Sequence, residues 1–226
     1  MSKDQADTVV LASGGLDSTV LAYHLRDEGR RIRMVSFDYG QRHRRELQAA
    51  ALVATALRVT HDVVDLSVLG RLLGGSALTD GSVDMPDGHY TDATMQATIV
   101  PNRNAILAAI AVGIASAHGC GQVALGVHAG DHPVYPDCRP DFVELADRIA
   151  QAATANTVRV MAPFVTWSKG EIVGHGAALG VPYDLTWSCY RGELLHCGRC
   201  GTCVERREAF ELAGVPDPTG YAGGGH

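Results

Sequence analysis

The sequence is poor in aromatic residues and in positive charge, and it contains no long apolar run. Its 226 residues include 19 Lys and Arg against 25 Asp and Glu, a formal net charge of −6. A protein that wraps nucleic acid needs a basic surface, so we expect no direct nucleic-acid partner. The longest apolar run follows Asn104 and ends at His118, which suits a buried helix rather than a membrane span.

The first seven residues also lack the apolar segment of a secretion signal, so we expect a cytoplasmic protein without membrane contact. Apolar residues make up 46% of the chain and charged residues 19%, which allows a substantial hydrophobic core. The length suits one α/β domain with a small appendage. We place the main domain at residues 1–181 and the appendage, a small C-terminal module, at residues 182–226.

Strand and helix patterns alternate along most of the chain. Strands are expected at residues 8–12, 32–37, 62–66, 122–127 and 158–161, and helices at residues 18–28, 44–57, 101–117, 141–155, 168–180 and 203–213. This order predicts an α/β fold: a Rossmann-like parallel sheet with helices on both faces. The loops after Leu11, Phe37, Val127 and Met161 should then surround one cleft at the carboxyl ends of the strands. Residues 74–98 are rich in Gly, Asp, Thr and Ser and are expected to form a loop.

A glycine-rich turn separates the first strand from the first helix. The string S-G-G-L-D-S begins at Ser13, and its glycines allow the backbone to turn tightly and approach an anion. Backbone N–H groups at such a turn form a nest for phosphate oxygens. There is no G-K-[ST], so the string is not a Walker A loop. The alternative is a plain strand–helix turn in which Asp17 caps the helix.

Four of the six cysteines fall within a short segment near the C-terminus. Cys189, Cys197, Cys200 and Cys203 have the spacing C-x7-C-x2-C-x2-C, which lets four thiolates surround one tetrahedral ion. This predicts one structural zinc site, while a disulfide pair, a redox C-x2-C and an iron–sulfur cluster are the alternatives. Cys120 is expected to be a small core residue, and the nearby His196 a solvated loop residue.

The glycine-rich turn resembles the pyrophosphate loop of ATP pyrophosphatases, and further motifs narrow the resemblance. These are S-F-D-Y-G-Q-R-H from Ser36, V-P-N-R-N from Val100, Y-P-D-C-R-P-D-F from Tyr135, W-S-K-G-E-I-V from Trp167, and C-G-R-C-G-T-C followed by V-E-R-R-E-A-F. In this order they are similar to motifs of the 7-cyano-7-deazaguanine synthase family. The chain departs from the family pattern at Asn102, at Gly201 and around Asp131.

The resemblance implies an adenine nucleotide alpha hydrolase-like fold and a carbon–nitrogen ligase that depends on ATP and Mg²⁺. It implies that the carboxylate of 7-carboxy-7-deazaguanine is adenylated, that ammonia displaces AMP to give an amide, and that a second activation yields the nitrile. It also suggests a homodimer. The residues expected to line the ATP phosphates are Ala12, Ser13, Gly14, Gly15, Leu16, Asp17, Ser18, Thr19, Val20, Leu21 and Ala22.

The resemblance also points to side chains for catalysis and substrate binding. Lys169 and Arg103 are expected to hold phosphate or carboxylate, and Asp17 to hold Mg²⁺ or order the loop. The expected substrate-binding residues are Asp38, Tyr39, Gln41, His43, Asn104, Asp131, Tyr135, Asp137 and Arg139. Alternatively, Asp137 and Arg139 form a loop ion pair, and His128 is a packed loop residue.

Three rival functions are compatible with parts of this pattern. One is a related ATP pyrophosphatase that stops at the amide, and another is a tRNA-thiolating enzyme with a reactive cysteine or an iron–sulfur cluster. The third is a non-catalytic module that binds nucleotide and zinc. The acidic composition and the closed set of four cysteines favour the synthase over the tRNA-thiolating enzyme. The non-catalytic module would bind ATP or a deazapurine without releasing AMP and pyrophosphate.

Overall fold

A five-stranded parallel sheet organises the protein, for which a computed structural model describes residues 5–42, 44–89, 91–128 and 135–223. The strands are β1 (Thr8–Leu11), β2 (Ile32–Asp38), β3 (His61–Asp65), β4 (Gln122–Ala124) and β5 (Arg159–Met161), in the order β3-β2-β1-β4-β5. Every strand pair is parallel, and β1 lies between β2 and β4. The predicted fold class is therefore confirmed, with the strand order reversing at β1.

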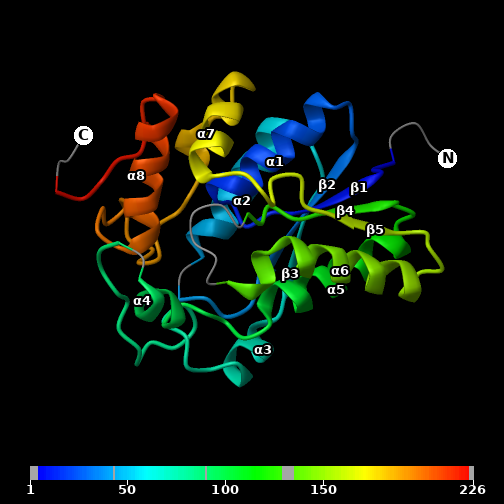
Figure 1. The fold of residues 1–226 in the computed structure, drawn as a ribbon, viewed down its shortest axis with the longest axis horizontal. Helices are drawn as coiled ribbons and strands as arrows, with labels where there is room; N and C mark the ends of the chain where they lie inside the picture. Colours follow the sequence, from blue (N-terminus) through cyan, green and yellow to red (C-terminus); the bar gives the residue numbers. More distant parts are fainter. Residues whose placement is uncertain (1–4, 43, 90, 129–134, 224–226) are drawn as a thin grey trace.

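Helices cover both faces of the sheet (Figure 1). On one side lie α1 (Leu16–Asp27), α2 (Arg45–Leu57), α7 (Lys169–Ala178) and α8 (Gly201–Ala213), and on the other lie α5 (Arg103–Ala117) and α6 (Pro140–Ala153). Short 3₁₀ turns occupy Pro136–Cys138 and Tyr183–Leu185. None of the described helices is both long and apolar enough to cross a membrane.

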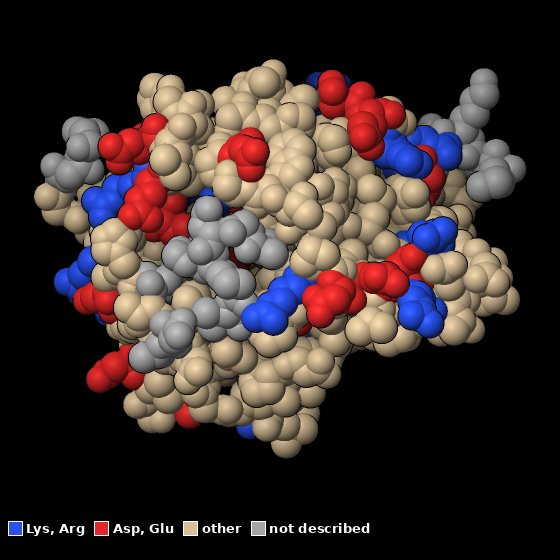
Figure 2. All heavy atoms as spheres, viewed as in Figure 1, with Lys and Arg blue, Asp and Glu red and all other residues tan. Residues whose placement is uncertain are grey.

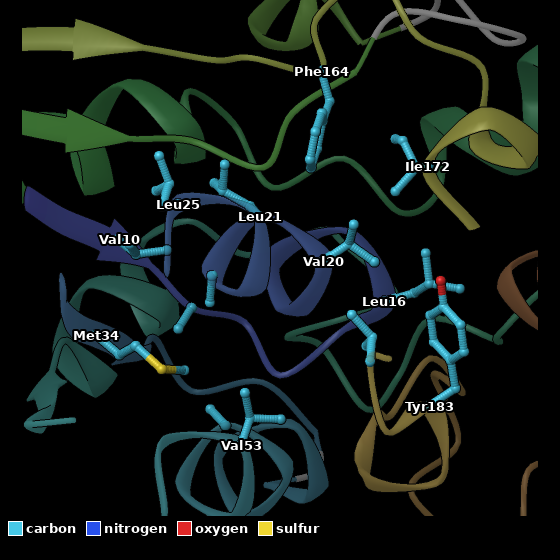
Figure 3. Packing of buried hydrophobic residues seen from close by; sticks show 14 of the residues in the cluster. Val10, Leu16, Val20, Leu21, Leu25, Met34, Val53, Phe164, Ile172 and Tyr183 are labelled. Atoms are coloured by element: carbon cyan, nitrogen blue, oxygen red, sulfur yellow. The ribbon is translucent and has the colours of Figure 1, made fainter. Parts of the chain in front are cut away.

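Alternating residues of β1 supply the two hydrophobic layers. Val10 faces α1, α2 and α7, where it joins Leu21, Met34 and Phe164 in one buried cluster (Figure 3). Val9 faces the opposite layer, formed with α5 and α6. Each such fully buried aliphatic side chain contributes about 1.5–3 kcal/mol relative to exposure. This two-sided burial explains why the strand reads as a continuous apolar run.

The helix that follows the V-P-N-R-N string begins later than the sequence suggested. Pro101 was expected in its first turn, but α5 starts at Arg103. Asn102 precedes it with φ 56° and ψ 23°, a left-handed conformation that Asn tolerates better than most residues and that a helix cannot include. By contrast, the predicted start of α7 is confirmed: the Ser168 side chain accepts from the Glu171 N–H, and Glu171 reaches back to the Ser168 N–H.

The region expected to be a loop between β3 and α5 contains more structure than its composition indicated. It is preceded by α3 (Ser67–Leu72) and includes α4 (Asp92–Gln96). Ala77, Leu78 and Met85 are buried in a third hydrophobic cluster with three of the C-terminal cysteines. Because this stabilisation is tertiary, the local composition could not reveal it.

Candidate active site

A cavity of about 320 Å³ lies at the carboxyl ends of β1, β2 and β4. The loops after Leu11, Phe37 and Val127 line it as expected, while the stretch after Met161 contributes Lys169 at the start of α7. The cavity brings together twelve of the residues expected to act in catalysis or binding: Ala12, Ser13, Gly15, Leu16, Asp17, Ser18, Tyr39, Gln41, Arg103, Asn104, Tyr135 and Lys169.

The glycine-rich turn is shaped by its contact with α2 as well as by its own geometry. Gly14 has φ +80°, and a Cβ there would lie 2.0 Å from the Glu46 carbonyl oxygen. Gly15 is followed directly by α1, whose first turn contains Asp17 and Ser18. Hydroxyl groups hold the turn closed, since Ser13 Oγ lies 3.0 Å from Ser18 Oγ and Thr19 Oγ1 donates to the Gly15 carbonyl. The result is a helix N-terminus facing the cavity, as anion binding requires.

The rest of the expected ATP-loop stretch turns away from the cavity. Gly14 and Thr19 do not line it, and Val20, Leu21 and Ala22 are fully buried in the hydrophobic layer beneath. Only the segment from Ala12 to Ser18, apart from Gly14, is placed to contact a ligand. The side chains that follow hold α1 against the sheet.

Lys169 lies between two carboxylates from different parts of the chain. Its Nζ is 3.3 Å from Asp17 Oδ2 and donates to Glu205 Oε2 at 2.6 Å, and its side chain is 13% exposed. Burial alone would lower the pKa of Lys169, but the two carboxylates outweigh it and raise the pKa. Burial likewise favours neutral Asp17, yet Lys169 and His128 hold its pKa below the usual value. Lys169 and Asp17 are therefore both ionised at neutral pH.

One oxygen of Asp17 remains unpartnered in this cluster. Asp17 Oδ1 is buried and has no hydrogen-bond partner among the described residues. A buried ionised oxygen without a partner is costly unless a cation or a donor on a ligand meets it. The atom is a hard oxygen ligand of the kind that Mg²⁺ prefers.

Across the cavity, Arg103 faces Tyr39 and Glu46. The Arg103 guanidinium lies 5.8 Å from the centre of the Tyr39 ring and donates to its hydroxyl at 3.5 Å. Burial raises the pKa of Glu46 to about 7, against the opposing influence of Arg103. Burial also raises the pKa of Tyr39, so its hydroxyl stays protonated. The Arg103 guanidinium is therefore placed where it can pair with an anionic group of a substrate.

The remaining predicted substrate-binding residues divide into those that face the cavity and those that support it. Gln41, Asn104 and Tyr135 line it. Asp38 does not, because its carboxylate accepts from the Gly40 N–H and pairs with Arg44. Asp137 accepts from the Asn104 N–H at the start of α5, and Arg139 precedes α6 as its N-cap residue. His43 and Asp131 lie outside the described residues.

The four predicted metal ligands come together at one point. The sulfurs of Cys189, Cys197, Cys200 and Cys203 all lie within 4.8 Å of one another. Sulfurs around one tetrahedral ion at about 2.3 Å lie about 3.8 Å apart. Cys203 Sγ lies 3.9 Å from Cys197 Sγ and 3.5 Å from Cys200 Sγ, so the cluster could hold a single metal ion. Backbone N–H groups point at the sulfurs: Cys197 N–H donates to Cys189 Sγ at 3.3 Å, and Cys200 N–H to Cys197 Sγ at 3.3 Å. Such bonds stabilise thiolates.

His196, beside this cluster, is not the solvated residue that the sequence suggested. It is 5% exposed, its ring lies 4.2 Å from that of Trp187, and its Nε2 accepts from the Ser188 N–H. Burial lowers the pKa of His196 to about 4. Its imidazole is therefore neutral and is engaged in packing the C-terminal segment.

The C-terminal segment forms one wall of the cavity. The Trp187 N–H donates to the Gly14 carbonyl at 2.9 Å, and Trp187, Ser188, Tyr190 and Thr202 line the space beside Glu205. Arg206 is fully buried and holds this segment to α8 by donating to Thr186, Ser188 and Tyr183. The cysteine cluster and the cavity thus share one structural support.

Sequence reasoning missed several residues of the cavity, notably Glu46, Glu205 and Trp187. Glu46 lies in the first turn of the helix after β2, so its place beyond the carboxyl end of that strand was a usable signal. Glu205 follows Cys203 by two residues, but only the packing of α8 turns it toward Lys169. His128, weighed as a packed loop residue, lines the cavity and has a buried Nδ1 without a partner among the described residues.

A glycine-rich turn between β1 and α1 of a parallel sheet ordered β3-β2-β1-β4-β5 is typical of Rossmann-like α/β proteins, which bind ligands at the carboxyl ends of their strands. Two solved structures share this fold. NMN synthetase from Francisella tularensis has a TM-score of 0.54 and 15% identity, and the match covers 94% of this chain and 79% of that one. A 4-thiouridine synthetase solved with RNA and ATP has a TM-score of 0.51 and 16% identity, and the match covers 92% of this chain and 50% of that one.

Sequence comparison then fixes the family. The family described as queuosine biosynthesis protein QueC matches residues 7–214. The 7-cyano-7-deazaguanine synthase of Rhizobium johnstonii is 56% identical over 216 residues, 95% of this chain and 91% of that protein. That of Paracoccus denitrificans is 54% identical over 216 residues, with 95% and 92% covered. The chain therefore belongs to the QueC family of 7-cyano-7-deazaguanine synthases, which are carbon–nitrogen ligases.

Proposed function

We propose that this protein is an ATP-dependent 7-cyano-7-deazaguanine synthase. It converts 7-carboxy-7-deazaguanine and ammonia to the nitrile and releases AMP and pyrophosphate. The observation that carries the proposal is that Lys169, ion-paired with Asp17, shares one cavity with the glycine-rich turn and with Arg103. A phosphate nest and two cations in one enclosed space suit the joining of a carboxylate to the α-phosphorus of ATP.

Different polar groups of the cavity bind the two reactants, ATP and 7-carboxy-7-deazaguanine. The turn from Ala12 to Ser18 holds the phosphates, and Lys169 offsets the charge that develops at the α-phosphorus. Arg103 pairs with the substrate carboxylate, because a guanidinium binds it through two parallel hydrogen bonds. Mg²⁺ neutralises phosphate charge when bound, and Asp17 Oδ1 is the oxygen placed to hold it.

Substrate recognition falls to the side chains that line the space between these groups. Tyr39 and Tyr135 offer ring faces to the heterocycle, and Asn104 offers its amide oxygen. The Gln41 amide is bonded to the backbone of Tyr39 and Phe37, so Gln41 contributes to the shape of the cavity wall. Asp38, Asp137 and Arg139 act from behind this layer, by fixing the loops that carry it. His43 and Asp131 stay as proposed substrate contacts on sequence grounds alone.

We assign the four-cysteine cluster to one structural Zn²⁺. Four thiolates around a single ion leave no open position for a water or a substrate, as in structural zinc sites. The boundary that we propose between a nucleotide-binding domain, residues 1–181, and a zinc-binding module, residues 182–226, places all four ligands in the second part. The tRNA-thiolating alternative has less support, because burial raises the pKa of Cys138, the cysteine that lines the cavity, to about 12.

The surroundings of the enzyme are also part of the proposal. We expect a cytoplasmic protein that uses free ammonia and acts on no nucleic acid directly. Positive and negative side chains are interspersed on the face in Figure 2, without a broad basic area among its described residues. We also propose that the protein forms a homodimer, as its resemblance to the synthase family implies.

The test is to incubate the protein with ATP, Mg²⁺, ammonia and 7-carboxy-7-deazaguanine and to measure the mass of the product and the nucleotide released. We expect the nitrile and AMP. Accumulation of the amide would support the alternative that the reaction stops there, while ADP would contradict the proposal. Lys169→Met should lower AMP formation by about 10²–10³-fold, the usual cost of losing one group that stabilises transition-state charge.

A further inference from the structure

The proposed reaction, on which this inference rests, requires a proton acceptor that the groups described so far do not supply. Ammonia carries three hydrogens and the nitrile nitrogen carries none. One proton leaves as nitrogen bonds to the carbonyl carbon and the C–O bond to AMP breaks. A second leaves as the amide oxygen attacks another α-phosphorus and displaces pyrophosphate. The third leaves as the remaining C–O bond breaks and the triple bond forms.

Three carboxylates line the cavity among the described residues, and two of them are already engaged. Asp17 lies 3.3 Å from Lys169 Nζ, and Glu205 accepts from it at 2.6 Å. A carboxylate paired with an ammonium is a weak base, as the lowered pKa of Asp17 illustrates. Glu46 is the third, and its carboxylate has no hydrogen bond or ion pair within 4 Å to any described residue.

Glu46 is also held where a reacting nitrogen can reach it. It stands in the first turn of α2, directly behind the glycine-rich turn, since its own carbonyl is the atom that a Cβ on Gly14 would strike. The charged and titratable groups that act on it come from two neighbouring elements: Arg103 at the start of α5, and Tyr39 after β2. Trp187 lies nearby, stacked on Arg45 at 5.3 Å, and contributes no charge.

We propose that Glu46 is the proton acceptor that removes hydrogens from the substrate nitrogen as the amide and then the nitrile form. Attack by ammonia makes the nitrogen positively charged and therefore acidic, so an adjacent carboxylate takes its proton readily. After each step the protonated Glu46 returns its proton to water as pyrophosphate or AMP leaves, so that it is ionised again for the next transfer. Its pKa of about 7 supports this role, because a general base works best when its pKa is near the working pH.

His128 is the rival base. It lines the cavity, and its Nδ1 is buried with no hydrogen-bond partner among the described residues. It acts, however, on Asp17, whose pKa it lowers, so it lies with the phosphate side of the cavity rather than with Arg103. Variants of both residues are needed to separate the two.

The experiment compares two partial reactions in the full-length metal-loaded protein. Carboxylate-dependent exchange of labelled pyrophosphate into ATP, measured without ammonia, reports adenylation and needs no proton transfer from nitrogen. Nitrile formation, measured with ammonia, needs every such transfer. In Glu46→Gln we expect nitrile formation to fall by about 10²–10⁴-fold while exchange falls by no more than about tenfold. Glu46→Asp should recover part of the loss.

The pH dependence gives a second measurement. In the wild-type protein, with the concentration of free ammonia held constant at every pH, nitrile formation should decline as pH falls through about 7, because protonated Glu46 cannot accept a proton, whereas exchange should not follow this limb. The limb should be absent in Glu46→Gln. Equal losses of exchange and nitrile formation in Glu46→Gln, or selective loss in His128→Gln instead, would overturn the proposal. Absence of exchange in the wild-type protein would contradict the proposed function itself.

Discussion

The cysteine cluster and the cavity differ in the length of sequence that supplies their residues. The four cysteines lie between Cys189 and Cys203, and short turns bring their sulfurs together. The cavity collects side chains from Leu11 to Glu205, carried by strands and helices on both layers of the fold. A site whose residues are joined by local turns can be predicted from their spacing in the sequence. A site assembled by packing between distant segments can be identified only when the fold is known.

The two regions nevertheless depend on each other. Cys203 lies in the first turn of α8 and Glu205 follows two residues later, where it holds Lys169, the cation beside the glycine-rich turn. On the other side, the Trp187 N–H binds the Gly14 carbonyl only two residues before Cys189. An ion bound by the cysteines would therefore fix one wall of the cavity.

The largest effect that tests this dependence is expected from Cys200→Ser. Losing one of four thiolates should release the metal and with it on the order of 10 kcal/mol of binding free energy that stabilises the module. Metal content, measured by atomic emission, should fall together with the melting temperature and with AMP formation. Cys120→Ala is the matched control. Cys120 is buried in the other hydrophobic layer, so this variant should keep its metal and its activity. A folded, metal-free and active Cys200→Ser would show that the two regions are independent.

The fold and the two local motifs could be predicted because their signals lie within short windows. The apolar runs of β1 and β2, the Ser168–Glu171 capping box and the cysteine spacing each depend on a few adjacent residues. The left-handed Asn102, the burial of His196 and the existence of α4 depend on contacts with distant segments instead. Such contacts override local propensity.

Within the cavity the same division holds. Asp17, Lys169 and Arg103 stand in recognisable strings, and the structure lines the cavity with all three. Glu46 and Glu205 stand in helix sequences where a carboxylate is ordinary, and only the packing of α2 and α8 gives them a role. The residues that sequence reasoning missed are thus those whose function depends on which way a helix faces.

The second prediction concerns the cost of keeping an unpaired carboxylate in the cavity. Burial raises the pKa of Glu46 from 4.5 to about 7, so the native state binds a proton more tightly than the unfolded chain. Stability from this group is complete below pH 4.5 and is lost as pH rises to 7. Such a shift corresponds to at most about 3 kcal/mol.

Glu46→Gln should therefore raise the free energy of unfolding at pH 8, where the carboxylate is charged, and change it little at pH 4.5. Urea titrations of both proteins at the two pH values measure the difference. An equal effect at both pH values would mean that packing, not charge, decides the stability of this residue. A gain at pH 8 would show that the charged Glu46 carboxylate lowers the stability of the folded protein.

The smallest effect is expected where the two regions meet, at Glu205. Glu205→Gln keeps the shape of the side chain and removes its charge, so Lys169 keeps Asp17 as its only carboxylate partner within 4 Å among the described residues. We expect kcat to fall by about tenfold, or roughly 1.4 kcal/mol, with little change in metal content. Glu211→Gln is the control, because Glu211 is exposed on the same helix. If Glu205→Gln instead lost metal as Cys200→Ser does, Glu205 would belong to the support of the cluster. If kcat were unchanged, the Glu205–Lys169 contact would carry no catalytic effect, and the metal-binding region would act on the cavity through the wall that includes Trp187 and its contact with Gly14.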